Sequence, residues 1–145
     1  MTVNLSAETV HASSVASDGR AVLISGPSGS GKSDLTLRLI DRGFTLVSDD
    51  QTVVRREGER LLASAPATVA GKLEIRGIGI VDMERTEDIR VALLVELTNE
   101  IERLPEESRE RAVLGVGLPL VSIDAMTASA PAKVALALDL LGLKF

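Results

Sequence analysis

The sequence of 145 residues contains no cysteine, no tryptophan and no tyrosine. Without cysteine the chain forms no disulfide, binds no metal through thiolates and uses no cysteine nucleophile. Its aromatic residues are Phe44 and Phe145, so it lacks the aromatic platforms on which single-stranded nucleic acids stack. Its formal net charge is −5, whereas nucleic-acid-binding domains usually carry an excess of Lys and Arg. We therefore expect no nucleic-acid partner.

The chain also lacks long apolar runs and a signal-type N-terminus. No run approaches the roughly 20 apolar residues of a membrane-spanning helix, and residues 1–10 contain neither the basic nor the apolar region of a secretion signal. We therefore expect a cytosolic protein without a membrane partner. The residues that are present, 45% hydrophobic and 26% charged, are typical of a globular chain. The length favours one domain over residues 1–145.

Apolar periodicity and turn residues predict a fold that mixes strands and helices. Turn signals at Asp18-Gly19 and Glu57-Gly58 predict two β-hairpins. The predicted strands are 10–16, 21–24, 44–48, 52–56, 60–63, 91–97 and 120–123, with short apolar stretches at 73–75 and 78–81. The predicted helices are 33–42, which stops at Gly43, a short solvated helix at 106–112, and a closing helix at 131–141. The fold class is α/β: a P-loop nucleotide-binding domain with a mixed β-sheet, a phosphate loop between a strand and a helix, and extra β-hairpins.

The strongest functional signal is the segment Gly26-Pro27-Ser28-Gly29-Ser30-Gly31-Lys32-Ser33, which matches the pattern G-x-x-x-x-G-K-[ST] at every required position. An apolar strand leads into it and an amphipathic helix leads out. In such a loop the glycines let backbone N–H groups surround the β-phosphate, and the helix N-terminus favours negative charge. Lys32 would reach the β- and γ-phosphates, and the Ser33 hydroxyl would ligate Mg²⁺. We therefore predict a site for a nucleoside triphosphate, with ATP as substrate and Mg²⁺ as cofactor.

A pair of acids, Asp49-Asp50, follows the predicted strand at 44–48. Ligands of open α/β sheets bind at the carboxyl ends of strands. Two adjacent carboxylates of an extended chain point in different directions, so one acid would approach Mg²⁺ while the other acts as general base toward an attacking hydroxyl. The alternative is that the pair only opens the turn into the next hairpin. Asp82, after a shorter and glycine-broken apolar run, is the competing candidate.

His11 is the only histidine in the sequence. A single histidine on a strand of small residues is more often a packed or surface residue than a catalyst, although imidazole is the side chain that titrates near neutral pH.

The phosphate loop alone does not decide which class of phosphate-loop enzyme this chain belongs to. However, the chain has no N-K-x-D tetrapeptide for reading guanine and is short for a motor, so a phosphotransferase is the class that remains.

Several motifs, in this order and spacing, resemble the catalytic domain of HPr kinase/phosphorylase. They are His11 fifteen residues before Gly26, the phosphate loop, the stretch Leu46-Val47-Ser48-Asp49-Asp50, and the stretch Leu73-Glu74-Ile75-Arg76-Gly77-Ile78-Gly79-Ile80. The resemblance covers about residues 8–125. Enzymes of this family use ATP to phosphorylate a serine of the phosphocarrier protein HPr, and they remove the phosphate again by phosphorolysis, as part of bacterial phosphotransferase regulation.

The resemblance implies a role for each matching residue. Residues 26–33 would hold the phosphates, with Ser33 on Mg²⁺ and Lys32 as a catalytic residue. Asp50 would be the base toward the substrate serine and the acid in the reverse direction, while His11 would tune its protonation. Asp49 and Glu74 would lie around Mg²⁺. The resemblance also implies an HPr-like protein as partner and a hexamer as the assembly.

The sequence departs from the family pattern in four places. Only ten residues precede His11, so we expect the N-terminal domain of the family to be absent. The segment after Asp82, residues 83–89, is shorter than the family's flexible glycine-containing loop. Leu118-Pro119-Leu120 lacks the lysine of the family's I-P-K segment, and residues 128–133 replace its P-G-R-N element. Both elements serve the phosphorylase reaction and substrate contact, so the kinase direction is the leading interpretation. The alternatives are a small-molecule kinase and a nucleotide sensor without catalysis, although a sensor would lack the catalytic acid that Asp50 supplies.

Overall fold

A computed structural model describes residues 6–104 and 107–145. These residues form eleven strands, two α-helices and one short 3₁₀ helix, η1. In chain order the elements are β1 (Ala7–Val10), β2 (Ala12–Ser17), β3 (Arg20–Ser25), α1 (Lys32–Asp41), β4 (Thr45–Ser48), β5 (Thr52–Glu57), β6 (Arg60–Ser64), η1 (Ala67–Val69), β7 (Lys72–Ile75), β8 (Gly79–Asp82), β9 (Ile89–Leu97), β10 (Arg109–Val113), β11 (Val116–Ile123) and α2 (Ala130–Leu141).

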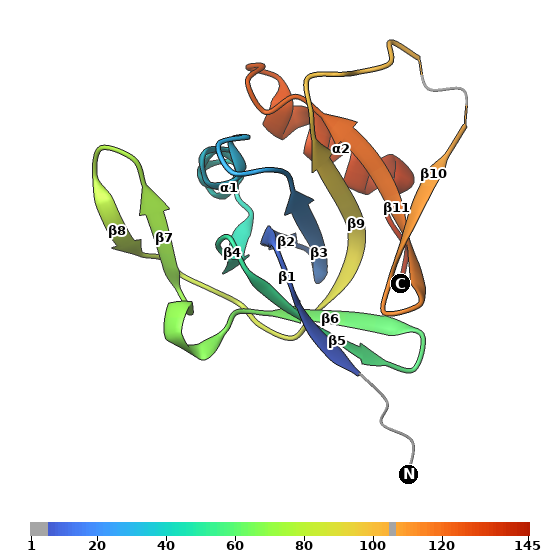
Figure 1. Cartoon of the computed structure of the whole chain (residues 1–145), viewed down its shortest axis with the longest axis horizontal. Coiled ribbons are helices and arrows are strands. Elements are labelled where there is room, and N and C mark those ends of the chain that lie inside the picture. Colours follow the sequence, from blue (N-terminus) through green and yellow to red (C-terminus); the bar gives the residue numbers. More distant parts are fainter. Residues whose placement is uncertain (1–5, 105–106) are drawn as a thin grey trace.

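One nine-stranded sheet organises the molecule (Figure 1). Its main path runs β1-β5-β6-β9-β3-β2-β4, and β11 joins β9 and carries β10 at its other edge. Strands β3, β9 and β11 are parallel, whereas the β2–β3, β5–β6 and β10–β11 pairs are antiparallel hairpins. The sheet is therefore mixed and contains the two hairpins that the sequence predicted, β2–β3 and β5–β6. Its parallel strands send their carboxyl ends toward one edge.

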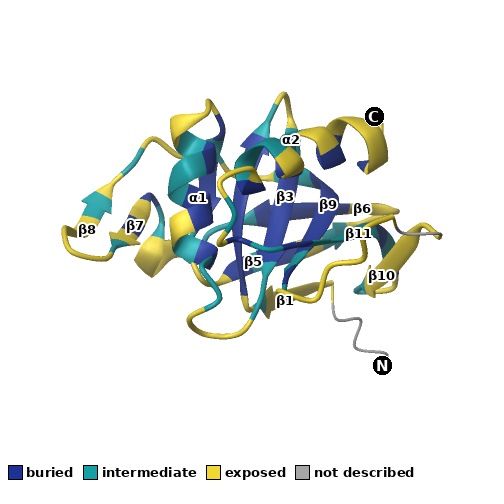
Figure 2. Cartoon of the chain, turned by 90° about the horizontal axis from the view of Figure 1, so that it is seen from above, coloured by how far each residue is buried: buried dark blue, intermediate teal, exposed yellow. Residues whose placement is uncertain are grey.

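The central strand β3 is buried on both faces, which fixes the base of the phosphate loop. Val22 and Ile24 pack into the apolar cluster that contains Leu35 of α1. Ala21 and Leu23 alternate with them and pack into a second cluster on the opposite face of the sheet. Figure 2 shows α1 and α2 covering one face, with β3 and β9 buried beneath them. Side chains of a strand alternate between the two faces of the sheet, so the continuous apolar run 21–24 is typical of a strand that is buried on both faces.

The predicted strand 10–16 is broken at His11. Residues before the histidine form β1, which pairs with β5 through Ala7–Val10, and residues after it form β2, which pairs with both β3 and β4. One run of small and β-branched residues thus serves two strands that pair with different partners. The break leaves His11 exposed between them.

The predicted helix at 106–112 is wrong where the structure describes it; Glu106 itself lies outside the described residues. Arg109–Val113 is strand β10, and it pairs antiparallel with β11 across the turn at Leu114 and Gly115, whose φ angles are 49° and 79°. Two successive left-handed residues are typical of a tight hairpin turn. The charged residues favour a helix locally, but pairing with the edge of the sheet overrides that weak preference. Consequently β11 also begins earlier than the predicted strand at 120–123.

Strands β7 and β8 form a separate two-stranded antiparallel sheet. The sequence predicted two short apolar stretches here, separated by Gly77, without pairing them. In Figure 1 this hairpin projects from the body on the side of α1. Its tip exposes Ile78 and Ile80. No helix in the described part of the chain is long and apolar enough to cross a membrane.

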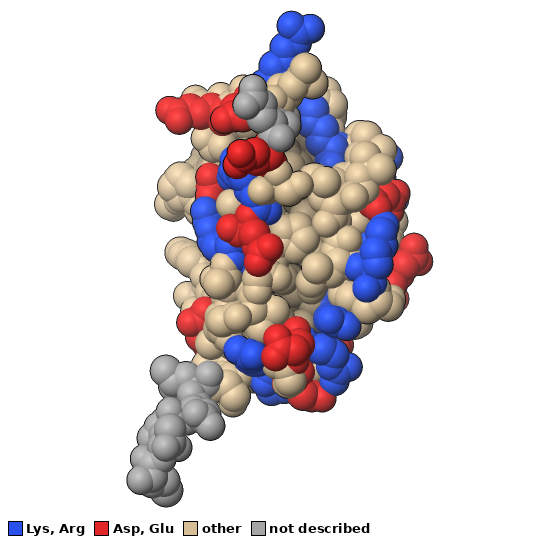
Figure 3. All heavy atoms as spheres, turned by 90° about the vertical axis from the view of Figure 1, so that its right-hand side faces the viewer, with Lys and Arg blue, Asp and Glu red and all other residues tan. Residues whose placement is uncertain are grey.

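The side of the molecule beside β10 and α2 carries both signs of charge. Figure 3 shows Lys and Arg next to Asp and Glu on this face rather than one continuous basic area. Among the described residues, Arg60 pairs with Glu57 and Arg111 pairs with Glu96. Opposite charges in contact reduce each other's field, so the pairing limits long-range attraction of a polyanion.

Arg38 of α1 ties the helix to the loop that follows β11. Its guanidinium donates hydrogen bonds to the backbone carbonyls of Ala125 and Thr127, the latter at 3.2 Å, and pairs with Asp34 at 3.0 Å.

We expect Arg38→Ala to lower the free energy of unfolding by about 1–3 kcal/mol, because two carbonyls lose a charged donor. Urea denaturation measures this change. Arg42→Ala, an exposed substitution after the same helix, should shift stability by less than about 0.5 kcal/mol, and equal losses in both variants would contradict this role of Arg38.

Candidate active site

The phosphate loop connects β3 to α1 and is shaped by its own backbone. Ser30 N–H donates to the carbonyl of Pro27 at 3.0 Å, and Gly31 precedes the helix with a φ of 96°. A Cβ at Gly26 would lie 2.5 Å from Ser30 Oγ, so that position admits no side chain without rearrangement. Residues 26–31 form this turn, with Ser28 and Gly29 exposed, and Lys32 and Ser33 are the first two residues of α1. The free N–H groups of the first helical turn make it a suitable site for an anion.

Lys32 is the first residue of α1 and is only 8% exposed. Its Nζ donates to the carbonyl of Gly26 at 2.8 Å and lies 3.3 Å from the carbonyl of Pro27. The ammonium is therefore held over the first residues of the loop. A cation there would neutralise phosphate oxygens bound in the turn.

Asp49 contacts the phosphate loop directly. Ser33 Oγ donates to Asp49 Oδ1 at 2.8 Å, and Ser13 Oγ of β2 donates to the same oxygen at 3.2 Å. The backbone N–H of Glu74 in β7 donates to Asp49 Oδ2 at 3.2 Å. The carboxylate is thus oriented from three elements of the fold, and its Oδ1 faces the serine that ends the loop motif.

Asp50 turns away from its neighbour toward His11. Its φ of 66° places it in the left-handed region, which Asp tolerates better than most residues and which is often found at functional sites. His11 Nε2 lies 3.4 Å from Asp50 Oδ1, and these side chains are 66% and 59% exposed. Asp50 N–H donates to Ser13 Oγ at 3.0 Å. The adjacent acids therefore face different partners, one toward the loop and one toward the open side at His11.

The oxygen donors near the loop fit Mg²⁺. Mg²⁺ is usually held by one or two protein oxygens, with phosphate oxygens and water as its other ligands, and Ser33 Oγ and Asp49 Oδ1 are such a pair. Within residues 6–104 and 107–145, no three Asp, Glu or His side chains form a metal-binding group by themselves. Glu74 contacts Asp49 through its backbone, and its side chain is exposed. A ligand role for the Glu74 carboxylate stays a prediction.

Asp82, the competing acid, lies on the hairpin β7–β8. It pairs with Lys72 at 2.7 Å across the two strands. The hydrogen bond from Lys72 and its charge hold the pKa of the Asp82 carboxyl below its ordinary value. None of the hydrogen bonds found among the described residues joins Asp82 to the phosphate loop. The geometry therefore favours Asp49 over Asp82 as the acid next to the loop.

Sequence reasoning missed two residues around the loop. Ser13 is fully buried and bridges both acids through its hydroxyl; its only signal was a polar residue two positions after His11. Glu96 lies near the end of β9, directly beside Ser25 of β3. Its signal was a carboxylate within the apolar run 91–97, which the prediction treated as a buried strand.

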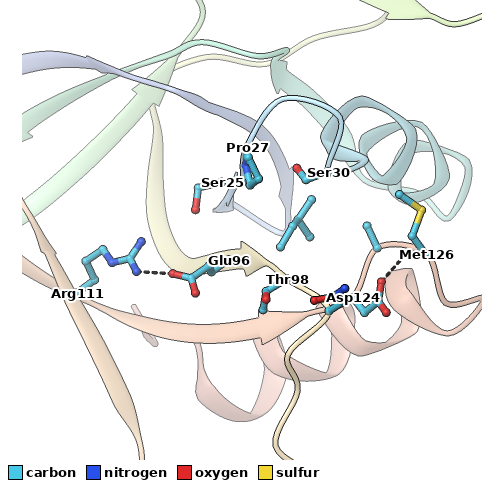
Figure 4. Close-up of a pocket in the computed structure, with 12 residues that line it drawn as sticks. Ser25, Pro27, Ser30, Glu96, Thr98, Arg111, Asp124 and Met126 are labelled. Atoms are coloured by element: carbon cyan, nitrogen blue, oxygen red, sulfur yellow. Dashed lines mark hydrogen bonds and ion pairs between the residues drawn. The ribbon is translucent and has the colours of Figure 1, made fainter.

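A groove of about 630 Å³ opens on the other side of the phosphate loop (Figure 4). Its lining comes from the loop, from the carboxyl ends of β3 and β9, from β10, and from the segment after β11. The lining residues are Ser25, Gly26, Pro27, Ser30, Glu96, Leu97, Thr98, Asn99, Arg111, Asp124, Ala125 and Met126. The loop therefore separates two regions, with the two acids on the side of β4 and the groove on the side of β9 and β11.

Comparison with known families gives one match over most of the chain. Residues 4–138 match the family model described as HPr Serine kinase C-terminal domain. The chain belongs to this family. The match includes the phosphate loop, Asp49, Asp50 and His11, the residues on which the resemblance was based.

Two HPr kinase/phosphorylases illustrate the similarity in sequence. The HPr kinase/phosphorylase of Chlorobium chlorochromatii (strain CaD3) is 41% identical over 127 residues, which is 78% of this chain and 38% of that protein. The HPr kinase/phosphorylase of Chloroherpeton thalassium is 40% identical over 126 residues, 78% of this chain and 37% of that protein. The chain thus spans less than two-fifths of the length of these relatives.

The fold of this chain is also similar to a solved structure. The Hpr(Ser) kinase/phosphatase from Coxiella burnetii superposes with a TM-score of 0.80 and 29% sequence identity, over 91% of this chain and 94% of that one. The architecture of a large mixed sheet with hairpins is therefore shared with that protein.

Proposed function

We propose that this chain is a kinase domain that transfers the γ-phosphoryl group of ATP to a serine of an HPr-type phosphocarrier protein in the cytosol. The observation that carries the proposal is the continuous set of contacts from the phosphate loop to the acids. Ser33 contacts Asp49, and Ser13 links Asp49 to Asp50, which lies beside His11. Family membership supports the substrate class, because the relatives are named for HPr.

The residues have distinct tasks in this reaction. The loop N–H groups and Lys32 bind and orient the triphosphate, and Ser33 and Asp49 would hold Mg²⁺, which neutralises phosphate charge when bound. The serine oxygen forms a bond to the γ-phosphorus while the bond from that phosphorus to the β-phosphate oxygen breaks, leaving ADP. The Asp50 carboxylate accepts the proton of the serine hydroxyl. Its exposure leaves it accessible to a serine of another protein.

The reverse activity is a further part of the proposal, and it rests on the names of the relatives. In phosphorolysis, inorganic phosphate would take the phosphoryl group from phosphoserine, giving pyrophosphate, and the proton on Asp50 would return to the serine oxygen. Leu120 stands where the family pattern has a lysine that serves this reaction. We therefore propose the kinase direction as the main activity.

One experiment separates the proposed function from its runner-up. The protein is incubated with labelled ATP, Mg²⁺ and HPr-like proteins, and in parallel with a panel of small-molecule phosphate acceptors. We expect label on a serine of the HPr-like protein and none on the small molecules. Label on a small molecule alone would make the chain a small-molecule kinase, and ATP binding without transfer to any acceptor would make it a nucleotide sensor.

His11 supplies the next prediction, because it is the side chain that contacts Asp50 in the structure. We expect His11→Ala to slow phosphoryl transfer by roughly 10²–10⁴-fold, the range of a lost acid–base contribution. Stopped assays of transfer to an HPr-like protein measure the loss. A rate indistinguishable from wild type would show that the histidine has no catalytic role.

Assembly follows from the same proposal. The resemblance implies a hexamer, and α2 exposes Leu136, Leu140 and Leu141, which are available for contacts between copies of the chain. Single exposed apolar residues are common on monomers, so the assembly remains a proposal based on the family. A fully active monomer in light scattering would contradict it.

A further inference from the structure

The groove beside the phosphate loop has no task in the transfer step. Its position is nevertheless tied to the same ligand, because Gly26, Pro27 and Ser30 belong both to the loop and to the groove wall. Asp49 and Ser33 lie toward β4 and mark the side at which the γ-phosphate and Mg²⁺ would sit. A nucleotide whose phosphates occupy the loop in this direction extends its other end away from β4, toward β9 and β11, where the groove opens (Figure 4).

The charges in the groove do not suit a further anion. Glu96 is paired with the guanidinium of Arg111, and Asp124 Oδ1 accepts the backbone N–H of Met126 at 2.9 Å. Two carboxylates against one guanidinium leave the groove with a negative balance. Phosphate groups would be repelled there, whereas an uncharged ligand with hydrogen-bonding edges would not be.

The apolar part of the groove lies next to the loop. Pro27, Leu97, Ala125 and Met126 contribute apolar surface, and Met126 is 73% exposed. The methyl group of Met126 lies 3.5 Å from the position that a Cβ on Gly31 would occupy, so this side chain lies against the start of α1. Flexible thioether side chains adapt to flat apolar and aromatic surfaces, and the chain offers no aromatic residue in the groove to serve instead.

We propose that this groove binds the base and ribose of the nucleoside triphosphate, with Met126 covering a face of the base and the Asn99 amide bonding to its polar edge. The size is appropriate, since ligand pockets are commonly about 300–1,000 Å³. The inference rests on the proposed function, because the phosphate loop would bind the phosphates of the same nucleotide. The groove would hold its uncharged part, the base and the ribose.

Calorimetric titration of the whole chain with ATP and with inorganic triphosphate, both with Mg²⁺, tests the inference. Inorganic triphosphate has the charges of ATP without the nucleoside. We expect ATP to bind at least about tenfold more tightly to the wild type. Met126→Ala and Asn99→Ala should each reduce this preference by about fivefold, the size of one lost contact, without changing the affinity for inorganic triphosphate. Leu140→Ala removes a similarly exposed side chain, 76% exposed, on α2 and should change neither affinity.

The outcomes separate the inference from the proposed function. The inference is wrong if inorganic triphosphate binds and ATP binds no tighter, or if both groove variants keep the wild-type preference for ATP. In either case the nucleoside does not occupy the groove, but the proposal that the loop binds phosphates is unaffected. If neither ligand binds, the proposed function fails and the inference fails with it. If Met126→Ala weakens binding of an HPr-like protein and leaves the ATP preference intact, the groove is an acceptor surface and the inference is wrong.

Discussion

Replacing Lys32 by alanine is expected to reduce phosphoryl transfer by at least about 10²–10³-fold, the loss typical of one donor removed from a developing negative charge. The ammonium is positioned over the loop by contacts with the carbonyls of Gly26 and Pro27. In the reaction it would neutralise the β- and γ-phosphate oxygens, whose charge is redistributed as the bond to phosphorus breaks. Steady-state transfer to an HPr-like protein measures the loss.

Two further variants separate charge from packing at Lys32. Lys32→Met keeps an unbranched side chain in this buried position, and we expect it to lose as much activity as Lys32→Ala while its far-UV circular dichroism matches the wild type. Lys133→Ala removes an exposed lysine from the first turn of α2 and should retain full activity. Near-normal transfer by Lys32→Met would mean that the loop does not use this charge, and the phosphate-loop mechanism would be wrong.

Asp50→Asn is expected to lower transfer by about 10²–10⁴-fold, as removal of a general base does, while ATP binding stays close to wild type. Asparagine keeps the shape of the side chain and tolerates the left-handed backbone at this position, so the fold should persist. It lacks the carboxylate that would accept the serine proton. Equilibrium dialysis with ATP and transfer assays on the same preparation measure binding and chemistry separately.

The structure supplies a matched control for this substitution. Asp88 is also an exposed aspartate with a positive φ, 54°, but it contacts Arg55 and Ser64 rather than the site. Asp88→Asn should therefore transfer phosphate at the wild-type rate. Asp82→Asn should do so as well, because Asp82 is paired with Lys72 on the hairpin. Wild-type transfer by Asp50→Asn, together with loss in Asp82→Asn or Asp49→Asn, would reassign the base.

The phosphate loop and its two flanking elements could be predicted from sequence because their signals are local. The glycines, Lys32 and Ser33 follow each other at fixed spacing, and the apolar run that becomes β3 leads directly into them. The mixed sheet also followed from local turn and alternation signals. Contacts between distant segments were harder. The proximity of Asp49 to Ser33 depended on placing both at the same edge of the sheet, and the contact between His11 and Asp50 was implied by family resemblance.

The features that sequence did not predict depend on pairing between strands. Arg109–Val113 became a strand because it pairs with β11 across the turn at Leu114 and Gly115, although its charged residues favour a helix locally. The role of Ser13 as a bridge arises only when β2 lies beside the chain at Asp49 and Asp50. Glu96 belongs to a run that the sequence predicted as a buried strand. Its place beside Ser25 follows from the parallel pairing of β9 with β3.

The most direct test of the account is an experimental structure of this chain with a non-hydrolysable ATP analogue and Mg²⁺. We predict that the β-phosphate lies within residues 26–33, that the metal ion contacts Ser33 Oγ and an oxygen of Asp49, and that the γ-phosphate faces Asp50 and His11. Nucleotide density outside the loop, or a metal ion held at Asp82 with Asp49 and Asp50 remote from the γ-phosphate, would contradict it.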